Sequence, residues 1–399
     1  MRNLLPAVIL CGVLCGTPAY AQFQPAAPLP IPRHSHGAAL MADGRVMLAG
    51  GLGSTIAVSS SAVVYDPVAD AWSIGPSLAA ARLDFPLVRL LSGRLLAISG
   101  YVPSGGAYEP TAESYDPLTN AWGAAGSLST PRRFHTATVL HDGRVLVTGG
   151  AGGVSLAMSS AEVYTPATNG WSSAAPMLAA REQHSATLLA SGKVLVVGGG
   201  TYTGGAALAG AEVYDPQTNT WSPTAPLPVA TGSGSAATLA DGRVLVVGSD
   251  AVAFYDPATN AWTAGPPLLL PRSRATATAL TGCAVLAGGG FVPFPTGSVG
   301  NVEAFETRAD AWTAVGVLPE GRSGGSMIRL QGGDVLIAGG LEFKSAGFRW
   351  LSQVYRYVPP SSFACQPDAP TAVPAGGPFA WLLLTGLTGV AATFRLRRR

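Results

Sequence analysis

Residues 135–171 read HTATVLHDGRVLVTGGAGGVSLAMSSAEVYTPATNGW and hold one complete repeat of the fold. We expect a first strand over 135–140 and a second over 144–148, which ends at a glycine pair. Asp142-Gly143 between them predicts a two-residue hairpin turn, because glycine takes positive φ freely. These two strands form the first half of the repeat.

The second half of the repeat follows a ten-residue loop. A third strand is expected at 162–164, and the Thr-Pro-Ala-Thr-Asn segment at 165–169 predicts a turn. A fourth strand then carries Trp171. The stretch therefore predicts four antiparallel strands in one unit.

This unit recurs about every fifty residues. Glycine pairs or their variants end the second strand at Gly50-Gly51, Ser99-Gly100, Gly149-Gly150, Gly198-Gly199, Gly248-Ser249, Gly288-Gly289 and Gly339-Gly340. Tryptophans follow at positions 72, 122, 171, 221, 262 and 312. Four antiparallel strands repeated at this period predict the blades of a β-propeller.

The number of blades follows from the two ends of the repeat array. Seven glycine-pair strands precede only six tryptophans, so the last unit lacks a fourth strand. Phe23 to Pro30 matches Trp221 to Pro228 in register, which places the missing strand at the start of the mature chain. We predict an all-β fold of seven four-stranded antiparallel blades, closed by an N-terminal strand against residues 353–357. Six or eight blades are the alternatives.

The pattern of an apolar strand, a Gly-Gly pair, a tyrosine and a tryptophan resembles the kelch repeat. The resemblance covers Phe23 to about Val358, and we assign residues 22–358 to the propeller. It implies the fold and leaves the function open. Two faces are expected: a turn face with the short hairpin turns, and a loop face with the variable loops, where function is usually found.

Both ends of the chain are predicted to lie outside the propeller. Residues 1–21 have a positively charged start, an apolar run and small residues at 19 and 21, as in a secretory signal peptide. Cleavage would fall between Ala21 and Gln22. An N-terminal membrane anchor is the alternative.

The other end combines a linker with a membrane-directed tail. Residues 359–377 form a Pro-rich linker, and 378–399 hold a 17-residue uncharged stretch followed by four arginines. This tail resembles bacterial sorting signals of the exosortase or rhombosortase type. We expect an exported protein, in the cell envelope or outside the cell, with the arginines cytoplasmic unless the tail is cut.

Composition limits the partners. Only 12% of the residues are charged and 48% are hydrophobic, which excludes a disordered chain. Without the arginines of the two ends, the body has a net charge near −3 and lacks the basic face of a nucleic-acid binder. We expect a monomer with a protein or glycan ligand, no nucleic acid and no cofactor.

Arginines recur ten residues before the hairpin aspartate, and histidines follow three residues later in three units. The candidate ligand-binding residues, at the mouth of the central channel, are Arg33, His36, Arg132, His135, Arg181, His184 and Arg322. Such cations suit carboxylates, sulfates or acidic sugars. The structural alternative is a set of ion pairs: Arg82–Glu113, Arg132–Glu162, Arg181–Glu212 and Arg272–Glu303. Unit five lacks both partners, having Thr231 and Ala253 instead, which favours the pairs.

Aromatic residues form a second candidate set on the variable loops. They are Tyr101, Tyr108, Tyr202, Phe291, Phe294, Phe343, Phe348 and Trp350. Exposed aromatic side chains on such loops bind sugars or protein partners, and the alternative is that they pack loop against loop. Unit five has almost no loop here, which predicts a notch at that blade.

Two enzyme classes share kelch-like propellers. Copper radical oxidases that resemble galactose oxidase need a Tyr-His pair, and this chain has no Tyr-His dipeptide. Kelch-type sugar epimerases stay open because of the cations at the channel mouth. The histidine spacing gives no evidence for a metal site. We therefore favour an exported binding module, with an enzyme acting on acidic sugars as the alternative.

Cysteine usage predicts one disulfide. Cys283 and Cys365 are the cysteines that remain after signal removal, and export would place them where disulfides persist. Cys283 lies in the unit-six hairpin, and a flexible linker could bring Cys365 within bridging distance. Two free thiols are the alternative.

Overall fold

The computed structural model describes residues 23–53, 57–102, 106–153, 156–201, 206–248, 251–281, 283–293, 296–345, 347–360 and 363. Contacts divide the chain after Ala364, and every described strand belongs to the first unit. The described residues form strands and turns without an α-helix, so they include no helix that could cross a membrane. The predicted signal peptide, its cleavage site and the sorting tail lie outside the described residues.

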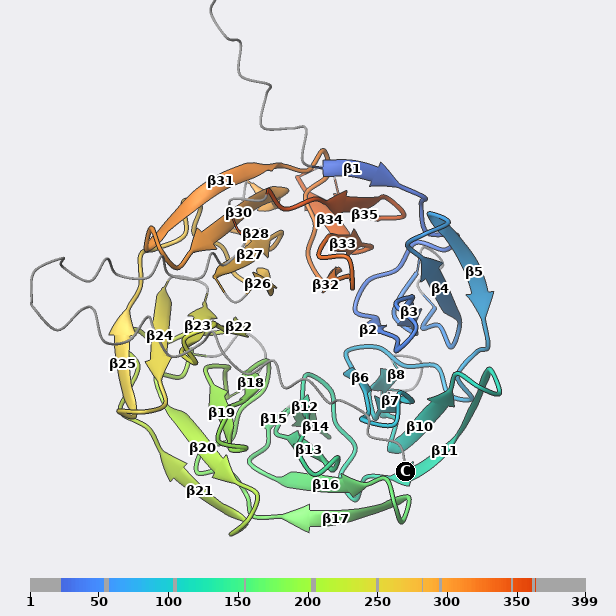
Figure 1. Cartoon of the computed structure of the whole chain (residues 1–399). Helices are drawn as coiled ribbons and strands as arrows, with labels where there is room; N and C mark the ends of the chain where they lie inside the picture. The colour runs from blue at the N-terminus through green and yellow to red at the C-terminus, as the bar shows by residue number, and fades with distance from the viewer. Residues whose placement is uncertain are drawn as a thin grey trace, which may run out of the picture. The chain divides into compact units, whose positions relative to one another are not determined.

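Seven four-stranded antiparallel sheets surround one axis (Figure 1). The strands of each blade are given from the axis outward. Blade 1 contains β2 (Gly37–Leu40), β3 (Val46–Ala49), β4 (Ala62–Asp66) and β5 (Ala71–Gly75), and blade 2 contains β6 (Leu87–Arg89), β7 (Leu95–Ile98), β10 (Thr111–Asp116) and β11 (Ala121–Ser127). Blade 3 contains β12 (Thr136–Val139), β13 (Val145–Thr148), β16 (Ala161–Thr165) and β17 (Gly170–Ala174), and blade 4 contains β18 (Ser185–Leu188), β19 (Val194–Val197), β20 (Ala211–Asp215) and β21 (Thr220–Pro223). Blade 5 contains β22 (Ser235–Thr238), β23 (Val244–Val247), β24 (Val252–Asp256) and β25 (Ala261–Ala264). Blade 6 contains β26 (Thr276–Thr281), β27 (Ala284–Gly288), β30 (Asn301–Glu306) and β31 (Ala311–Val317). Blade 7 contains β32 (Ser326–Arg329), β33 (Val335–Ala338), β36 (Val354–Tyr357) and β1 (Phe23–Ala26). The seven-bladed all-β prediction is confirmed.

Blade 7 is assembled from both ends of the repeat array. Strand β1 runs antiparallel to β36, with Phe23 opposite Tyr357 and Ala26 opposite Val354. The rings of Phe23 and Tyr357 lie 5.3 Å apart, and Leu29 is buried just after the strand. The predicted closure by the N-terminal strand is therefore confirmed.

Four blades extend their loops on the loop face into short ribbons. The ribbons are β8 (Tyr101–Val102) with β9 (Ala107–Tyr108), β14 (Ala151–Gly152) with β15 (Leu156–Ala157), β28 (Phe291–Val292) with β29 (Gly297–Ser298), and β34 (Leu341–Lys344) with β35 (Gly347–Trp350). They belong to blades 2, 3, 6 and 7.

The repeated residues explain how neighbouring blades stack. The second strand of each blade is buried along its whole length, as in β13 and β33. In blades 1 to 5 the third-strand tyrosine packs on the tryptophan of the fourth strand, with the Tyr164 and Trp171 rings 5.2 Å apart. The Trp171 indole then donates a 2.8 Å hydrogen bond to the Ala125 carbonyl of blade 2. Apolar burial and this polar tie together join one blade to the next.

Blade 6 differs from the sequence-based alignment in one respect. A bulge between Ala279 and Thr281 shifts its hairpin turn. Gly288 therefore belongs to β27, and the glycine pair is Gly289-Gly290, both at positive φ (64° and 105°). The pairing of Gly288 with Gly289 was wrong because the bulge adds a residue that the spacing does not reveal.

Candidate functional site

Blade 3 shows how the repeated arginine is held. Both Arg132 and Glu162 are almost inaccessible, and their side chains form a 2.8 Å ion pair. The Arg132 guanidinium also donates to the carbonyls of Gly149 (2.9 Å) and Ser160 (3.0 Å). The Glu162 carboxylate in turn accepts a 2.8 Å hydrogen bond from the Ser129 amide. The pair thus ties the loop that enters the blade to the loop between its second and third strands.

The four predicted ion pairs are confirmed. Arg82–Glu113, Arg132–Glu162, Arg181–Glu212 and Arg272–Glu303 have N–O distances of 2.6, 2.8, 2.8 and 2.5 Å. Repeated geometry in a dry interior indicates a scaffold role, because such pairs hold loops in register.

Blades 1 and 7 keep the arginine without a third-strand glutamate. Arg33 donates to the carbonyls of Gly50 and Ser61 at 3.2 and 3.0 Å, and burial lowers its pKa to about 10. Arg322 donates to the Gly339 carbonyl and approaches Glu320 at 3.5 Å. Burial likewise lowers the pKa of Arg322 to about 10. Both guanidinium groups are therefore held by their own blades.

The three candidate histidines lie between blades. His184 places Nε2 3.0 Å from the hydroxyls of Thr136 and Thr148 in blade 3, and His36 places Nε2 3.2 Å from Ser326 of blade 7. Burial lowers the pKa of both His36 and His184 to about 3 and holds that of His135 well below its ordinary value. His135 and His184 are buried and His36 is partly buried, and the lowered pKa keeps all three imidazoles neutral near pH 7. Packing therefore accounts for them, and ligand binding by this arginine and histidine set stays a prediction.

The glycine pairs explain why the blades can approach so closely. The Gly51 amide donates a 2.9 Å hydrogen bond to the Arg82 carbonyl of the next blade, and the Gly150 amide does the same for Arg181. Gly50 has φ +66°, and a Cβ there would lie 2.5 Å from the Arg82 carbonyl oxygen. A side chain would force the blades apart, which explains the glycine.

One position next to the axis differs in chemistry from blade to blade. We call it the inner rim: Ser35, Asp84, Phe134, Gln183, Ser233, Arg274 and Gly324, each two residues after the repeated arginine or its replacement. Six of the seven share a left-handed backbone, with φ of 54°, 54°, 55°, 55°, 56° and 64° for Ser35, Asp84, Phe134, Gln183, Arg274 and Gly324. The position has no signature in the sequence, because no single residue type identifies it.

Backbone hydrogen bonds join most of the inner rim. The donors are the amides of Ser35, Asp84, Phe134 and Gln183, and each bonds to the carbonyl of the preceding rim residue at 2.9–3.0 Å. The rim residues precede the innermost strands, which surround the axis in Figure 1. The scaffold therefore presents different side chains in one fixed geometry at the loop-face end of the axis.

Charged groups gather beside the inner rim. The Arg133 guanidinium lies 4.5 Å from the Tyr101 ring and 4.8 Å from the Phe134 ring, within cation–π distance. Burial raises the pKa of Asp84 to about 6, while a Ser35 hydrogen bond and the charges of Arg133 and Arg274 oppose the shift. The Asp84 carboxylate therefore interacts electrostatically with Arg133 of blade 3 and Arg274 of blade 6.

The aromatic residues of the loops pack in pairs. The ring centroids of Tyr101 and Tyr108 lie 5.2 Å apart, those of Phe291 and Phe343 6.0 Å, and those of Phe348 and Trp350 5.0 Å. Phe343 and Phe348 remain 40% and 56% exposed. Tyr202 and Phe294 lie outside the described residues. Loop packing and exposure thus occur together, and ligand binding by these aromatics stays a prediction.

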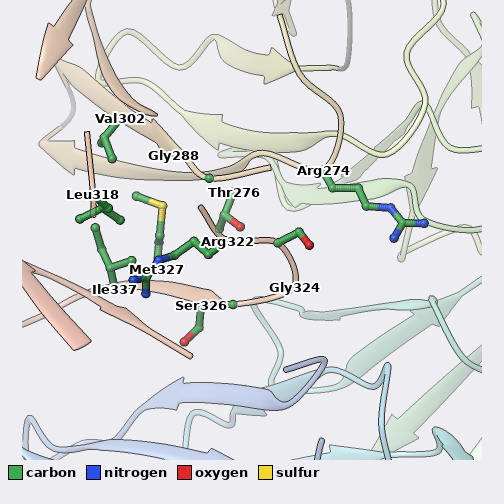
Figure 2. A pocket seen from close by; sticks show the side chains of 13 residues that line it. Arg274, Thr276, Gly288, Val302, Leu318, Arg322, Gly324, Ser326, Met327 and Ile337 are labelled. Atoms are coloured by element: carbon green, nitrogen blue, oxygen red, sulfur yellow. The ribbon is translucent and has the colours of Figure 1, made fainter. Parts of the chain in front are cut away.

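Enclosed space near the axis is small. A pocket between blades 6 and 7, lined by Arg274, Arg322, Met327 and Ile337, has a volume of about 10 Å³ (Figure 2). That volume holds at most one water molecule. Figure 2 shows the Arg274 side chain extending away from the apolar lining residues. A larger ligand would therefore not fit in this pocket.

Comparison with known proteins agrees with the architecture. A Kelch motif family model matches residues 132–178 and 185–228, which include blades 3 and 4. Together with the seven blades, the matches support a kelch-repeat β-propeller. A fungal alcohol oxidase of the AA5 family, solved in complex with copper, is similar to this propeller with a TM-score of 0.67 and 14% identity. The similarity covers 85% of this chain and 76% of that one. Comparison with curated proteins found no match.

The likeness to the copper enzyme concerns the fold. Copper sites bring several nitrogen, oxygen or sulfur ligands together. The described part of the kelch propeller contains no group of three or more His, Cys, Asp or Glu side chains that could hold a metal. These residues therefore do not fit the copper of that oxidase.

Only one of the two cysteines in the predicted disulfide lies among the described residues. Cys283 is disulfide-bonded. Cys365 lies outside the described residues, so its pairing with Cys283 stays a prediction.

Proposed function

We propose that this kelch propeller is an exported, envelope-associated binding module that recognises its ligand with the loop face. The observation that carries the proposal is the inner rim. Six blades repeat its left-handed backbone, while the side chains range from serine to aspartate, phenylalanine, glutamine and arginine. A position that only supported the fold would not need such varied chemistry, whereas a recognition surface does.

The surrounding loops supply further binding chemistry. Exposed Phe343 and Phe348 lie on the β34–β35 ribbon of blade 7, and Tyr101 with Tyr108 lies on the β8–β9 ribbon of blade 2. Aromatic rings offer large contact areas with few rotatable bonds. The loop face thus combines polar groups near the axis with aromatic groups farther out.

Export rests on the two chain ends. The signal-like start and the sorting-like tail support a position outside the cytoplasm, with the tail in the membrane unless it is cut. Envelope localisation would be tested by fractionating cells that produce the full chain. Recovery of the propeller in the cytoplasmic fraction would contradict it.

Binding is tested by screening the full chain, purified in mild detergent, on an array of neutral and acidic glycans. Asp84→Asn and Gln183→Ala should weaken binding at least tenfold, because they change polar groups of the inner rim. Arg308→Gln, in an exposed turn on the turn face, is the control and should bind like the parent. Equal binding by all three variants would contradict recognition by the loop face.

One observation favours a second candidate, an enzyme that acts on acidic sugars. A carboxyl with a pKa of about 6 beside arginines is suited to accept and return a proton near neutral pH. Conversion of an acidic sugar that Asp84→Asn abolishes without loss of sugar binding would establish this alternative.

A further inference from the structure

We propose that the inner rim binds a carboxylated sugar, a hexuronate unit of a glycan, through Arg274 and Arg133. The inference rests on the proposed binding function and names its ligand class. Four elements carry it: two cations, an acceptor carboxylate, neutral hydrogen-bonding groups and an aromatic pair. They come from blades 1, 2, 3, 5 and 6.

Within the described residues, the two cations have no carboxylate partner. Thirteen ion pairs join described residues, and neither Arg133 nor Arg274 takes part in one. Arg274 is exposed, and the Nε of Arg133 is buried without a hydrogen-bond partner among the described residues. Both guanidinium groups have unused donors, in contrast to the engaged donors of Arg132. A guanidinium in this state is suited to bind a carboxylate.

Both arginines interact electrostatically with the same carboxylate, that of Asp84. Charges on Arg133 and Arg274 both stabilise the ionised form of Asp84, and the Glu182 carboxylate opposes them. Asp84 lies next to Phe134 in the inner rim, since the Phe134 amide donates a 3.0 Å hydrogen bond to the Asp84 carbonyl. Asp84 and Arg274 are both inner-rim residues with the same left-handed backbone, so a ligand over the inner rim meets both side chains.

The neighbouring groups favour a sugar over an acidic peptide. A chain of carboxylates would meet repulsion from Asp84 and Glu182. A sugar carries one carboxylate per ring, and its hydroxyls are donors for which the Asp84 carboxylate is a strong acceptor. Ser35 and Ser233 add hydroxyls, and the Ser233 hydroxyl already donates to Gln183.

An aromatic platform completes the site. The rings of Tyr101 and Tyr108 lie 5.2 Å apart beside Arg133, at centroid distances of 4.5 and 6.0 Å from its guanidinium carbon. The face of a pyranose is rich in C–H groups and packs on aromatic rings. The sugar would stack near blade 2 while its carboxylate reaches toward blade 6.

The test compares each acid with its uncharged ester. Trisaccharides that contain one galacturonate, glucuronate or mannuronate unit and two neutral sugars, and the methyl ester of each, are titrated calorimetrically into the full chain in mild detergent. At least one acid should bind tenfold or more tightly than its ester, because esterification removes only the charge. Equal affinities for acid and ester, or binding of neutral glycans alone, would overturn the inference while leaving the binding function intact.

Variants assign the effect to the cations. Arg274→Gln and Arg133→Gln should each weaken binding of the acid at least tenfold and change binding of the ester by less than twofold. Arg308→Gln, the matched loss of an arginine on the turn face, should leave both unchanged. Equal losses for acid and ester in Arg274→Gln would overturn carboxylate recognition, and so would an Arg308→Gln loss as large as that of Arg274→Gln.

Discussion

Blades 3 and 5 have the same four strands but are held differently. In blade 3, Arg132 and Glu162 form a buried ion pair and bond to the loops on both sides. Blade 5 has Thr231 and Ala253 at the same positions, and the Thr231 hydroxyl is buried without a partner among the described residues. The ion pair is therefore not needed to form a blade.

The difference appears at the inner rim instead. Phe134 of blade 3 has a left-handed backbone conformation, and its amide donates a hydrogen bond to the Asp84 carbonyl of blade 2. Ser233 of blade 5 has no positive φ, and neither its amide nor that of Arg274 joins the chain of backbone bonds within the described residues. The comparison teaches that the left-handed rim accompanies the repeated arginine, which blade 5 replaces by Thr231. Among the described residues, the chain of backbone bonds joins the rim of blades 7, 1, 2, 3 and 4.

The largest expected effect comes from removing one partner of the pair in blade 3. Glu162→Ala leaves Arg132 buried without its carboxylate and the Ser129 amide without its acceptor. We expect a loss of about 3–5 kcal/mol in the free energy of unfolding, measured by denaturant titration. Thr231→Val in blade 5 is the control, and it should change stability by about 0.5 kcal/mol or less because no bond is lost. Similar losses for both variants would remove the distinction between the blades.

A smaller loss of folding stability is expected at acidic pH. His184 has a folded-state pKa of about 3, because burial disfavours its charged form, against about 6.5 when unfolded. The unfolded chain binds the proton more readily, so stability present above pH 6.5 is lost as the pH falls toward 3. This slope is at most about 1.4 kcal/mol per pH unit for one histidine.

The slope can be assigned by substitution, since blade 5 has Gly234 at the position of His184. His184→Gln should reduce the slope of unfolding free energy between pH 6.5 and 3. His141→Gln, at an exposed turn, should leave the slope as it is. An unchanged slope in His184→Gln would show that this imidazole is not the group that titrates on unfolding.

The fold could be predicted because the residues that make its main contacts recur in successive units of the sequence. Glycine pairs, third-strand tyrosines and fourth-strand tryptophans mark the same contacts in successive units, and Phe23 aligned with the tryptophans reveals the closing strand. The Arg–Glu pairs followed from the joint replacement of both partners in blade 5. Each of these contacts depends on one residue type at one spacing, which a sequence shows directly.

The site could not be predicted in the same way. The repeated arginines and histidines drew attention because they repeat, yet they lie inside the scaffold. The inner rim is defined by backbone conformation, and residues as different as Phe134 and Arg274 adopt it. Neither the left-handed φ nor the approach of Arg133 to Tyr101 has a signature in the sequence.

The central claim is that a chain of backbone hydrogen bonds fixes the inner rim on blades 7 and 1 to 4 and leaves it unfixed at blades 5 and 6. Residue-level hydrogen exchange of the native protein tests this most directly. The amides of Ser35, Asp84, Phe134 and Gln183 should exchange on the order of 100-fold more slowly than those of Ser233 and Arg274, because in the described part of the chain only the first four have acceptors in the rim. Equal exchange rates at all six amides would contradict the account.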